Sequence, residues 1–306
     1  MQSVILLPAA YRHITPLLNE FFRIACLERP KIVYVGRSSV TISKTENLFR
    51  VSKQLVKALR LRRQIRAKLT ERLFQEKTNV FIYSVSGNSE NKIENNGDLG
   101  AVYQLSANIS NSIGIPFISS LDYNWKETDS QFVSAYPSLF ELWRMFREQI
   151  RMFNHLTSFR NKTCLVGEIE IPFELVSQEM LLGLRYSHMV NLAWFSNYFE
   201  RLDAGVKVFF SDEFYTTGRI LSAAARKCNR KNITTYGVQH GLLLENHTVY
   251  RISDLEFEDF IRRNDGLPKP DFFVTWGSYF SNLFLQINSL PEEYVIAAGN
   301  LKYCTL

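Results

Sequence analysis

Short apolar strands alternate with helix-like stretches along this chain, and that alternation limits the fold more than any other feature. We expect strands at Val4–Ala9, Lys31–Gly36, Val80–Tyr83, Pro116–Ile118, Val206–Phe210, Thr234–Val238, Phe272–Gly277 and Tyr294–Gly299. Apolar runs of this kind, separated by helices, are typical of parallel βαβ units. The pattern predicts an α/β protein with a Rossmann-like parallel sheet, helices on both faces and further helical additions.

Helical periodicity fills the stretches between these strands. We expect helices at Ile14–Leu27, Glu46–Glu76, Leu99–Ile113, Phe132–Asn161, Pro172–Leu202 and Gly218–Cys228. In the second helix, the residues near one face are Leu55, Leu59, Ile65, Leu69 and Leu73. The region near 132–202 is interpreted as a helical insertion. Aromatic residues recur there at helical spacing: Tyr136, Phe140, Trp143, Phe146 and Phe153. This stripe favours a core role over a ligand-binding one.

Positive charge is concentrated in one predicted helix. The whole chain carries 36 Lys and Arg against 30 Asp and Glu, a net charge of +6. Between Lys53 and Arg72 the only acidic residue is Glu71, and leucines interleave with the cations. A solvated outer face is the favoured interpretation of Lys53–Arg72, and contact with an anionic membrane is the second. Nucleic acid is the least favoured partner, because no nucleic-acid-binding motif accompanies the stretch.

Cysteine spacing and missing motifs exclude several classes of protein. The four cysteines lie far apart with no Cys-x-x-Cys pair, so we expect no zinc site and no disulfide framework. The chain has no run of about 18 apolar residues, and its start lacks the basic region of a signal peptide. We therefore expect a cytoplasmic location. Gly-x-Ser-x-Gly, Walker A and Gly-x-Gly-x-x-Gly signatures are also missing, which disfavours esterases, P-loop enzymes and dehydrogenases.

Two strand ends carry ionisable residues. Asp212 and Glu213 follow the strand Val206–Phe210. In open α/β sheets ligands lie beyond the carboxyl ends of the strands, and a carboxylate there can deprotonate a hydroxyl. An N-cap for the next helix is an equally good interpretation of Asp212. His240 follows Thr234–Val238 and can bind phosphate as a cation or act as an acid or base.

Further polar segments follow these two strand ends. Gly241 permits a positive φ or a close approach of the backbone to a ligand. His247 and Arg251 belong to a polar stretch with interleaved aromatic residues. Asn300 follows Gly299 in a turn that could bring backbone amides toward a phosphate.

The order of these segments resembles GT-B-type glycosyltransferases of bacterial capsule and O-antigen synthesis. The resemblance covers about residues 200 to 303. Its elements are a strand followed by Asp212, the Gln239-His240-Gly241 tip, a Pro270-Asp271 strand ending in Trp276-Gly277, and the turn from Val295 through Gly299-Asn300 to Tyr303. It implies transfer of a sugar from a nucleotide-activated donor to a glycan or lipid-linked acceptor.

The resemblance also implies roles for individual residues. Asp212 would be the base that deprotonates the acceptor hydroxyl, with Glu213 as the alternative. His240 would contact the donor and stabilise charge on the leaving group. Gln239 would orient nearby polar groups, and Arg219 or Arg251 would neutralise an anionic ligand. No cofactor and no metal are expected, since the chain has no Asp-x-Asp triplet.

Domain organisation follows from the same resemblance. Residues 1–290 would form a Rossmann-like acceptor-side domain, and residues 291–306 would begin a second, truncated one. Most of the nucleotide-binding half would then be missing or reside on a separate chain. The alternative function is a non-catalytic module of a two-chain glycosyltransferase that docks an acceptor or the inner face of the plasma membrane.

Overall fold

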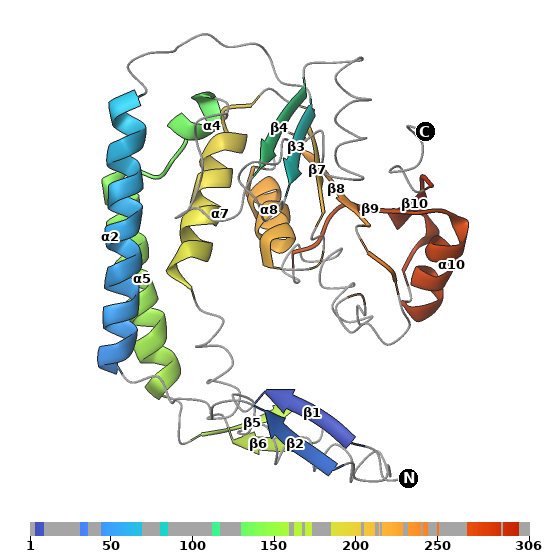
Figure 1. Ribbon diagram of the computed structural model, residues 1–306, viewed down its shortest axis with the longest axis horizontal. Coiled ribbons are helices and arrows are strands. Elements are labelled where there is room, and N and C mark those ends of the chain that lie inside the picture. Colours follow the sequence, from blue (N-terminus) through green and yellow to red (C-terminus); the bar gives the residue numbers. More distant parts are fainter. Residues whose placement is uncertain are drawn as a thin grey trace. The chain divides into compact units, whose positions relative to one another are not determined.

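Six parallel strands form the largest sheet of the protein in the computed structural model (Figure 1). Their order is β10-β9-β8-β7-β3-β4, and every neighbouring pair is parallel. The strands are β3 (Val80–Ser84), β4 (Ser112–Pro116), β7 (Lys207–Phe210), β8 (Thr234–Val238), β9 (Phe272–Thr275) and β10 (Val295–Ala297). The prediction of an α/β protein with a parallel sheet is confirmed.

The structure describes residues 4–8, 31–35, 44–68, 80–84, 112–116, 130–158, 162–166, 169–172, 185–202, 205–211, 214, 216–228, 232–239, 241–243, 250, 268–288 and 290–299. The predicted helices at 14–27 and over most of 99–113 lie outside these residues. So does the end of the predicted helix 46–76, with Leu69 and Leu73.

The chain divides into two units. One comprises Met1–Val56 and Trp143–Tyr186, and the other comprises Lys57–Leu142 and Ser187–Leu306. The second unit holds the six-stranded sheet. Its edge strand β10 falls in the stretch 291–306 that the sequence assigned to the start of a second domain.

Two small sheets accompany the first unit. β1 (Val4–Pro8) and β2 (Lys31–Val35) pair in parallel and form a sheet of their own. β5 (Thr163–Val166) and β6 (Ile169–Pro172) form an antiparallel hairpin. The sequence did not predict this hairpin, because residues on either side of it continue the helical pattern. Pro172, expected to begin a helix, ends β6 instead.

Helices occupy most of the remaining described segments. They are α2 (Lys44–Lys68), α4 (Ser130–Ser134), α5 (Leu139–Ser158), α7 (Tyr186–Phe199), α8 (Thr216–Lys227) and α10 (Ser278–Ile287), with the 3-10 turn η7 (Glu292–Tyr294). In the second unit α8 packs against β8, and α10 packs against β9 and β10 (Figure 1). Among the described helices, none combines the length and the apolar character needed to cross a bilayer.

A proline and a capping box divide the predicted helix 132–161 into α4 and α5. Pro137 disfavours helical backbone at the residue before it, so α4 ends early. Ser138 then begins α5: its backbone N–H donates to Oε2 of Glu141 at 2.7 Å, and the Glu141 N–H donates to the Ser138 hydroxyl at 3.2 Å. Reciprocal capping of this kind contributes about 1 kcal/mol to a helix.

The fourth strand lies slightly earlier in the chain than predicted. β4 spans Ser112–Pro116, whereas the sequence suggested a helix up to Ile113 and a strand at Pro116–Ile118. Ile113 and Ile115 are β-branched and suit extended backbone. Pro116 cannot donate to the ladder, which explains why it stands at the end of the strand.

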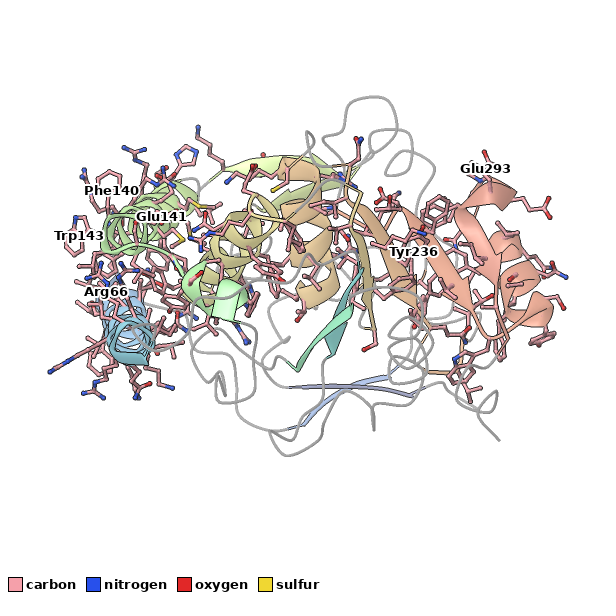
Figure 2. All side chains as sticks on the ribbon, turned by 90° about the horizontal axis from the view of Figure 1, so that it is seen from above. Arg66, Phe140, Glu141, Trp143, Tyr236 and Glu293 are labelled. Carbon is pink, nitrogen blue, oxygen red and sulfur yellow. The ribbon has the colours of Figure 1, made fainter. Side chains whose placement is uncertain are left out.

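Aromatic residues join the strands and fill the core of the second unit. Phe209, Tyr236 and Phe272 stack across β7, β8 and β9, with ring centroids 4.7 and 5.3 Å apart. Tyr236 is labelled in Figure 2. A second group of buried aromatic residues surrounds Phe273 and comprises Phe214, Tyr250, Phe284 and Tyr294. Each such aromatic pair adds about 0.5–1.5 kcal/mol beyond its area burial.

The predicted aromatic stripe near residue 140 is core only in part. Tyr136, Phe146 and Phe153 are buried, but Phe140 is 75% exposed and Trp143 is 53% exposed. The buried face of α5 runs instead through Leu142, Phe146, Gln149 and Phe153 at helical spacing.

The apolar face of α2 also differs from the prediction. Leu55 and Ile65 are buried as expected, whereas Leu59 is 37% exposed. Ala58 and Leu61 complete the buried face beside them. Leu59 lies between these two positions in sequence, and the 3.6-residue period turns it toward solvent.

Candidate functional site at the carboxyl edge of the sheet

The chain reverses its direction across the sheet between β3 and β7. β4 lies on one side of β3, whereas β7, β8, β9 and β10 follow one another toward the opposite edge. In open parallel α/β sheets, ligands bind beyond the carboxyl ends of the strands at such a reversal. The paired residues nearest those ends are Tyr83 on β3 and Phe210 on β7. The carboxyl edge beside β7 is therefore the candidate site.

Two-thirds of the predicted site residues lie outside the part of the chain that the structure describes. They are Asp212, Glu213, His240, His247, Arg251 and Asn300. Along the sequence, Asp212 is the second residue after β7 and His240 is the second residue after β8. β7 and β8 are neighbouring parallel strands, and their last paired residues are Phe210 and Gly237. Both segments thus leave the sheet at the same edge from adjacent strands.

Gln239 connects the ends of β8 and β9. Its side chain is fully buried. Nε2 of Gln239 donates to the carbonyl oxygen of Gly241 at 2.8 Å, and Oε1 accepts a hydrogen bond from the Trp276 backbone N–H at 3.0 Å. The Gln239 N–H donates to the carbonyl oxygen of Val274 at 2.9 Å. Gln239 therefore holds the backbone on both sides of position 240 and ties it to β9.

The glycines of this edge differ in their backbone conformation. Gly277 and Gly299 have φ of 133° and 82°, values that favour glycine over other residues. Gly241 does not have a positive φ, contrary to one interpretation of the sequence. A Cβ added at Gly241 would meet no atom of the described residues within 4 Å. The left-handed φ of Gly299 supports the predicted turn at the end of β10.

Arg219 lies on the first turn of α8, directly after the segment that contains Asp212. Its Nε donates to the carbonyl oxygen of Phe214 at 2.8 Å, and the side chain is partly buried. Phe214 packs in the aromatic core beside Phe273 and Phe284. The stem of Arg219 is therefore anchored to the connection between β7 and α8.

Two buried hydroxyls join β9 to α10 at the same edge. The Thr275 Oγ1 and Ser281 Oγ atoms lie 2.6 Å apart, and Thr275 Oγ1 also donates to the carbonyl oxygen of Gly277 at 3.3 Å. Both side chains are buried. Sequence reasoning missed this pair, because Thr275 is followed directly by Trp276-Gly277 and its partner Ser281 lies six residues further on, in α10.

Asp271, part of the Pro-Asp strand motif, lies at the opposite, amino edge. Its Oδ2 accepts hydrogen bonds from the Thr235 N–H at 2.8 Å and the Thr235 hydroxyl at 2.7 Å. The Asp271 N–H donates to Thr235 Oγ1 at 2.9 Å. Burial lowers the pKa of the nearby Arg226, and the negative charge of Asp271 partly offsets that effect. Asp271, directly before β9, thus joins that strand to Thr235 near the start of β8.

Within the described ranges, no three His, Cys, Asp or Glu side chains form a cluster that could hold a metal ion. Cys228, directly after α8, is buried and forms no disulfide, and its Sγ lies 3.5 Å from the carbonyl oxygen of Ser196. It behaves as a small core residue.

Comparison with known proteins gave no match to this chain among family models, curated proteins or solved structures.

Proposed function

We propose that this chain is a GT-B-type glycosyltransferase, or the acceptor-side half of one, that uses a nucleotide-activated sugar donor. One observation carries the proposal. β7 and β8 are adjacent and parallel, and the segments with Asp212 and His240 both begin at their carboxyl ends, beside the point where the chain reverses. Acid–base and phosphate-binding residues gather at this position in open α/β sheets.

The roles of the two residues follow from transfer chemistry. Asp212 accepts the proton of the acceptor hydroxyl as that oxygen attacks the sugar carbon. His240 donates a hydrogen bond to the departing nucleotide phosphate and so stabilises the charge that develops there. Arg219 adds positive charge on the first turn of α8. Gln239 contributes by holding the backbone on either side of His240, through its bonds to Gly241 and Trp276.

The test combines donor binding with turnover. The purified chain is screened by thermal shift against CMP-, UDP- and GDP-sugars, and nucleotide release is followed with a glycolipid acceptor extract. We expect Asp212→Asn to keep donor binding and lose release by about 100-fold or more. We expect His240→Asn to weaken donor binding and release together. Glu213→Gln tests the alternative base.

Two matched variants serve as controls. Glu293→Gln removes an exposed carboxylate from η7, and His155→Asn removes an exposed imidazole from α5. Both should behave as wild type. A chain that no nucleotide sugar stabilises and that releases no nucleotide would contradict a transferase that acts on its own, and only the acceptor-side half would remain. Full turnover in Asp212→Asn and Glu213→Gln together would contradict the proposal.

A further inference from the structure

The second half of α2 presents a row of arginines that the fold does not use. Arg60, Arg63 and Arg66 are exposed, and within the described part of the chain they make neither a hydrogen bond nor an ion pair. No acidic residue occurs between Lys57 and Lys68. Like charges one turn apart on a helix repel each other. The row therefore carries an electrostatic cost that an anionic partner would relieve.

Arg62, on the same part of α2, differs from these three arginines because it makes a hydrogen bond within the protein. Its Nη1 donates to the carbonyl oxygen of Pro137 at 2.6 Å. Burial lowers the pKa of Arg62, the positive charge of Arg66 lowers it further, and the charge of Glu141 opposes both effects. One arginine of this helix thus turns toward the protein, while its three neighbours remain in solvent.

Large apolar side chains lie beside this row, at the start of α5. The Tyr136 hydroxyl donates to the Ala58 carbonyl oxygen at 3.4 Å, so the turn that leads into α5 lies against α2. Phe140 on the first turn of α5 is 75% exposed. Phe140 and Arg66, both labelled in Figure 2, belong to the same unit.

The same aromatic and basic character continues along α5. Trp143, one turn after Phe140, is 53% exposed, and Arg144 and Arg147 are exposed beside it. We name Arg60, Arg63, Arg66 and Phe140, which all belong to the second unit, the outer helix face. Capping by Ser138 and Glu141 fixes the first turn of α5, so exposure of Phe140 is not a result of a frayed helix end.

We propose that the outer helix face docks on an anionic bilayer surface. The arginines contact lipid phosphates, and Phe140 enters the interface between headgroups and acyl chains. Aromatic side chains prefer that boundary, and cations on an amphipathic surface add attraction to anionic lipid. This inference is independent of the proposed function.

Vesicle flotation of the full chain tests the proposal. Vesicles of phosphatidylcholine alone are compared with vesicles that contain phosphatidylcholine and phosphatidylglycerol in about a 2:1 ratio. We expect flotation only with the anionic vesicles, and less of it at high salt. Replacing Arg60, Arg63 and Arg66 by Gln should lower the partition coefficient about 100-fold, from about fivefold for each cation. Phe140→Ser should lower it several-fold at unchanged charge.

The control removes the same charge elsewhere. Arg185, Lys207 and Lys227 are exposed and lie outside α2 and α5, and all three are replaced by Gln together. Thermal unfolding of every variant checks that the fold is intact. Absence of flotation with anionic vesicles overturns the proposal. Equal losses in the two triple variants overturn it as well, because they indicate general charge attraction. Binding of RNA without binding of vesicles overturns it in favour of a nucleic-acid surface.

Discussion

A charged side chain joins β8 to β9 at the amino edge of the six-stranded sheet, whereas a neutral one joins them at the carboxyl edge. The Asp271 carboxylate only accepts hydrogen bonds, and it receives both of the Thr235 donors. Gln239 donates with one end of its amide and accepts with the other, so it satisfies a carbonyl and an N–H in one residue. The amino edge tolerates a charge because Asp271 is partly exposed and lies near Arg226. The carboxyl edge, fully buried at Gln239, uses an uncharged group.

The largest effect is expected when the neutral side chain of Gln239, which joins β8 to β9 at the carboxyl edge, is replaced by a charged one. Gln239→Glu removes the donor to Gly241 and buries a carboxylate, so we expect a loss of about 3 kcal/mol or more in unfolding free energy at pH 7. Burial raises the folded-state pKa of the introduced carboxyl above the roughly 4.3 of the unfolded chain. The loss should therefore shrink as pH falls toward 4. Urea unfolding at both pH values measures it.

Gln64→Glu is the matched control, because Gln64 is exposed on α2. We expect its unfolding free energy to stay within about 0.5 kcal/mol of wild type. A Gln239→Glu protein as stable as the Gln64→Glu protein would contradict the bracing role of Gln239.

A smaller effect is expected when the charged side chain of Asp271, which joins β8 to β9 at the amino edge, is replaced by a neutral one. Asp271→Asn keeps one acceptor oxygen for Thr235 but loses the charge, so we expect a loss of about 1–2 kcal/mol by urea unfolding. Glu292→Gln, at an exposed carboxylate, is the control and should have no measurable effect. If Asp271→Asn costs as much as Gln239→Glu, the contrast between the two edges fails.

The smallest effect on stability is expected from Tyr236, which lies on β8 between Thr235, the partner of Asp271, and Gln239. Burial raises its pKa above 10, and the charge of Asp271 adds to that shift. The unfolded chain therefore loses the phenolic proton at lower pH than the folded protein, so this contribution to stability is complete below about pH 10 and is lost as pH rises through the folded-state pKa.

Tyr236→Phe should remove that part of the alkaline loss, by less than about 1 kcal/mol. Urea unfolding at pH 8 and pH 11 measures the difference against wild type, with the exposed Tyr279→Phe as the comparison. An alkaline decline that is unchanged in Tyr236→Phe would show that Tyr236 ionises alike in both states.

The sequence predicted the strands of the large sheet well, because buried parallel strands are short continuous runs of β-branched and aromatic residues. Its limits lie in long-range partners. The residues of Val4–Pro8 carry no local signal that β1 pairs with β2 in a sheet separate from the large one. The hydrogen bond that Gln239 accepts comes from the N–H of Trp276, a residue 37 positions further along the chain. The exposure of Phe140 depends on which face of α5 packs against the protein. The charged residues of the candidate site stay predictions, because Asp212 and His240 lie outside the described residues.

The pairing of β3 with β7 has a consequence for synthesis on the ribosome. β3 ends at Ser84, and β7 begins only at Lys207. At typical translation rates, that interval lasts on the order of ten seconds. If β3 and β4 pair first, the other edge of β3 stays unpaired during that time, and its backbone groups can form hydrogen bonds with strands of other chains. The nascent chain would then depend on chaperones most strongly before β7 leaves the ribosome, and destabilising changes in β7 should reduce soluble yield more than equal changes in the edge strand β10.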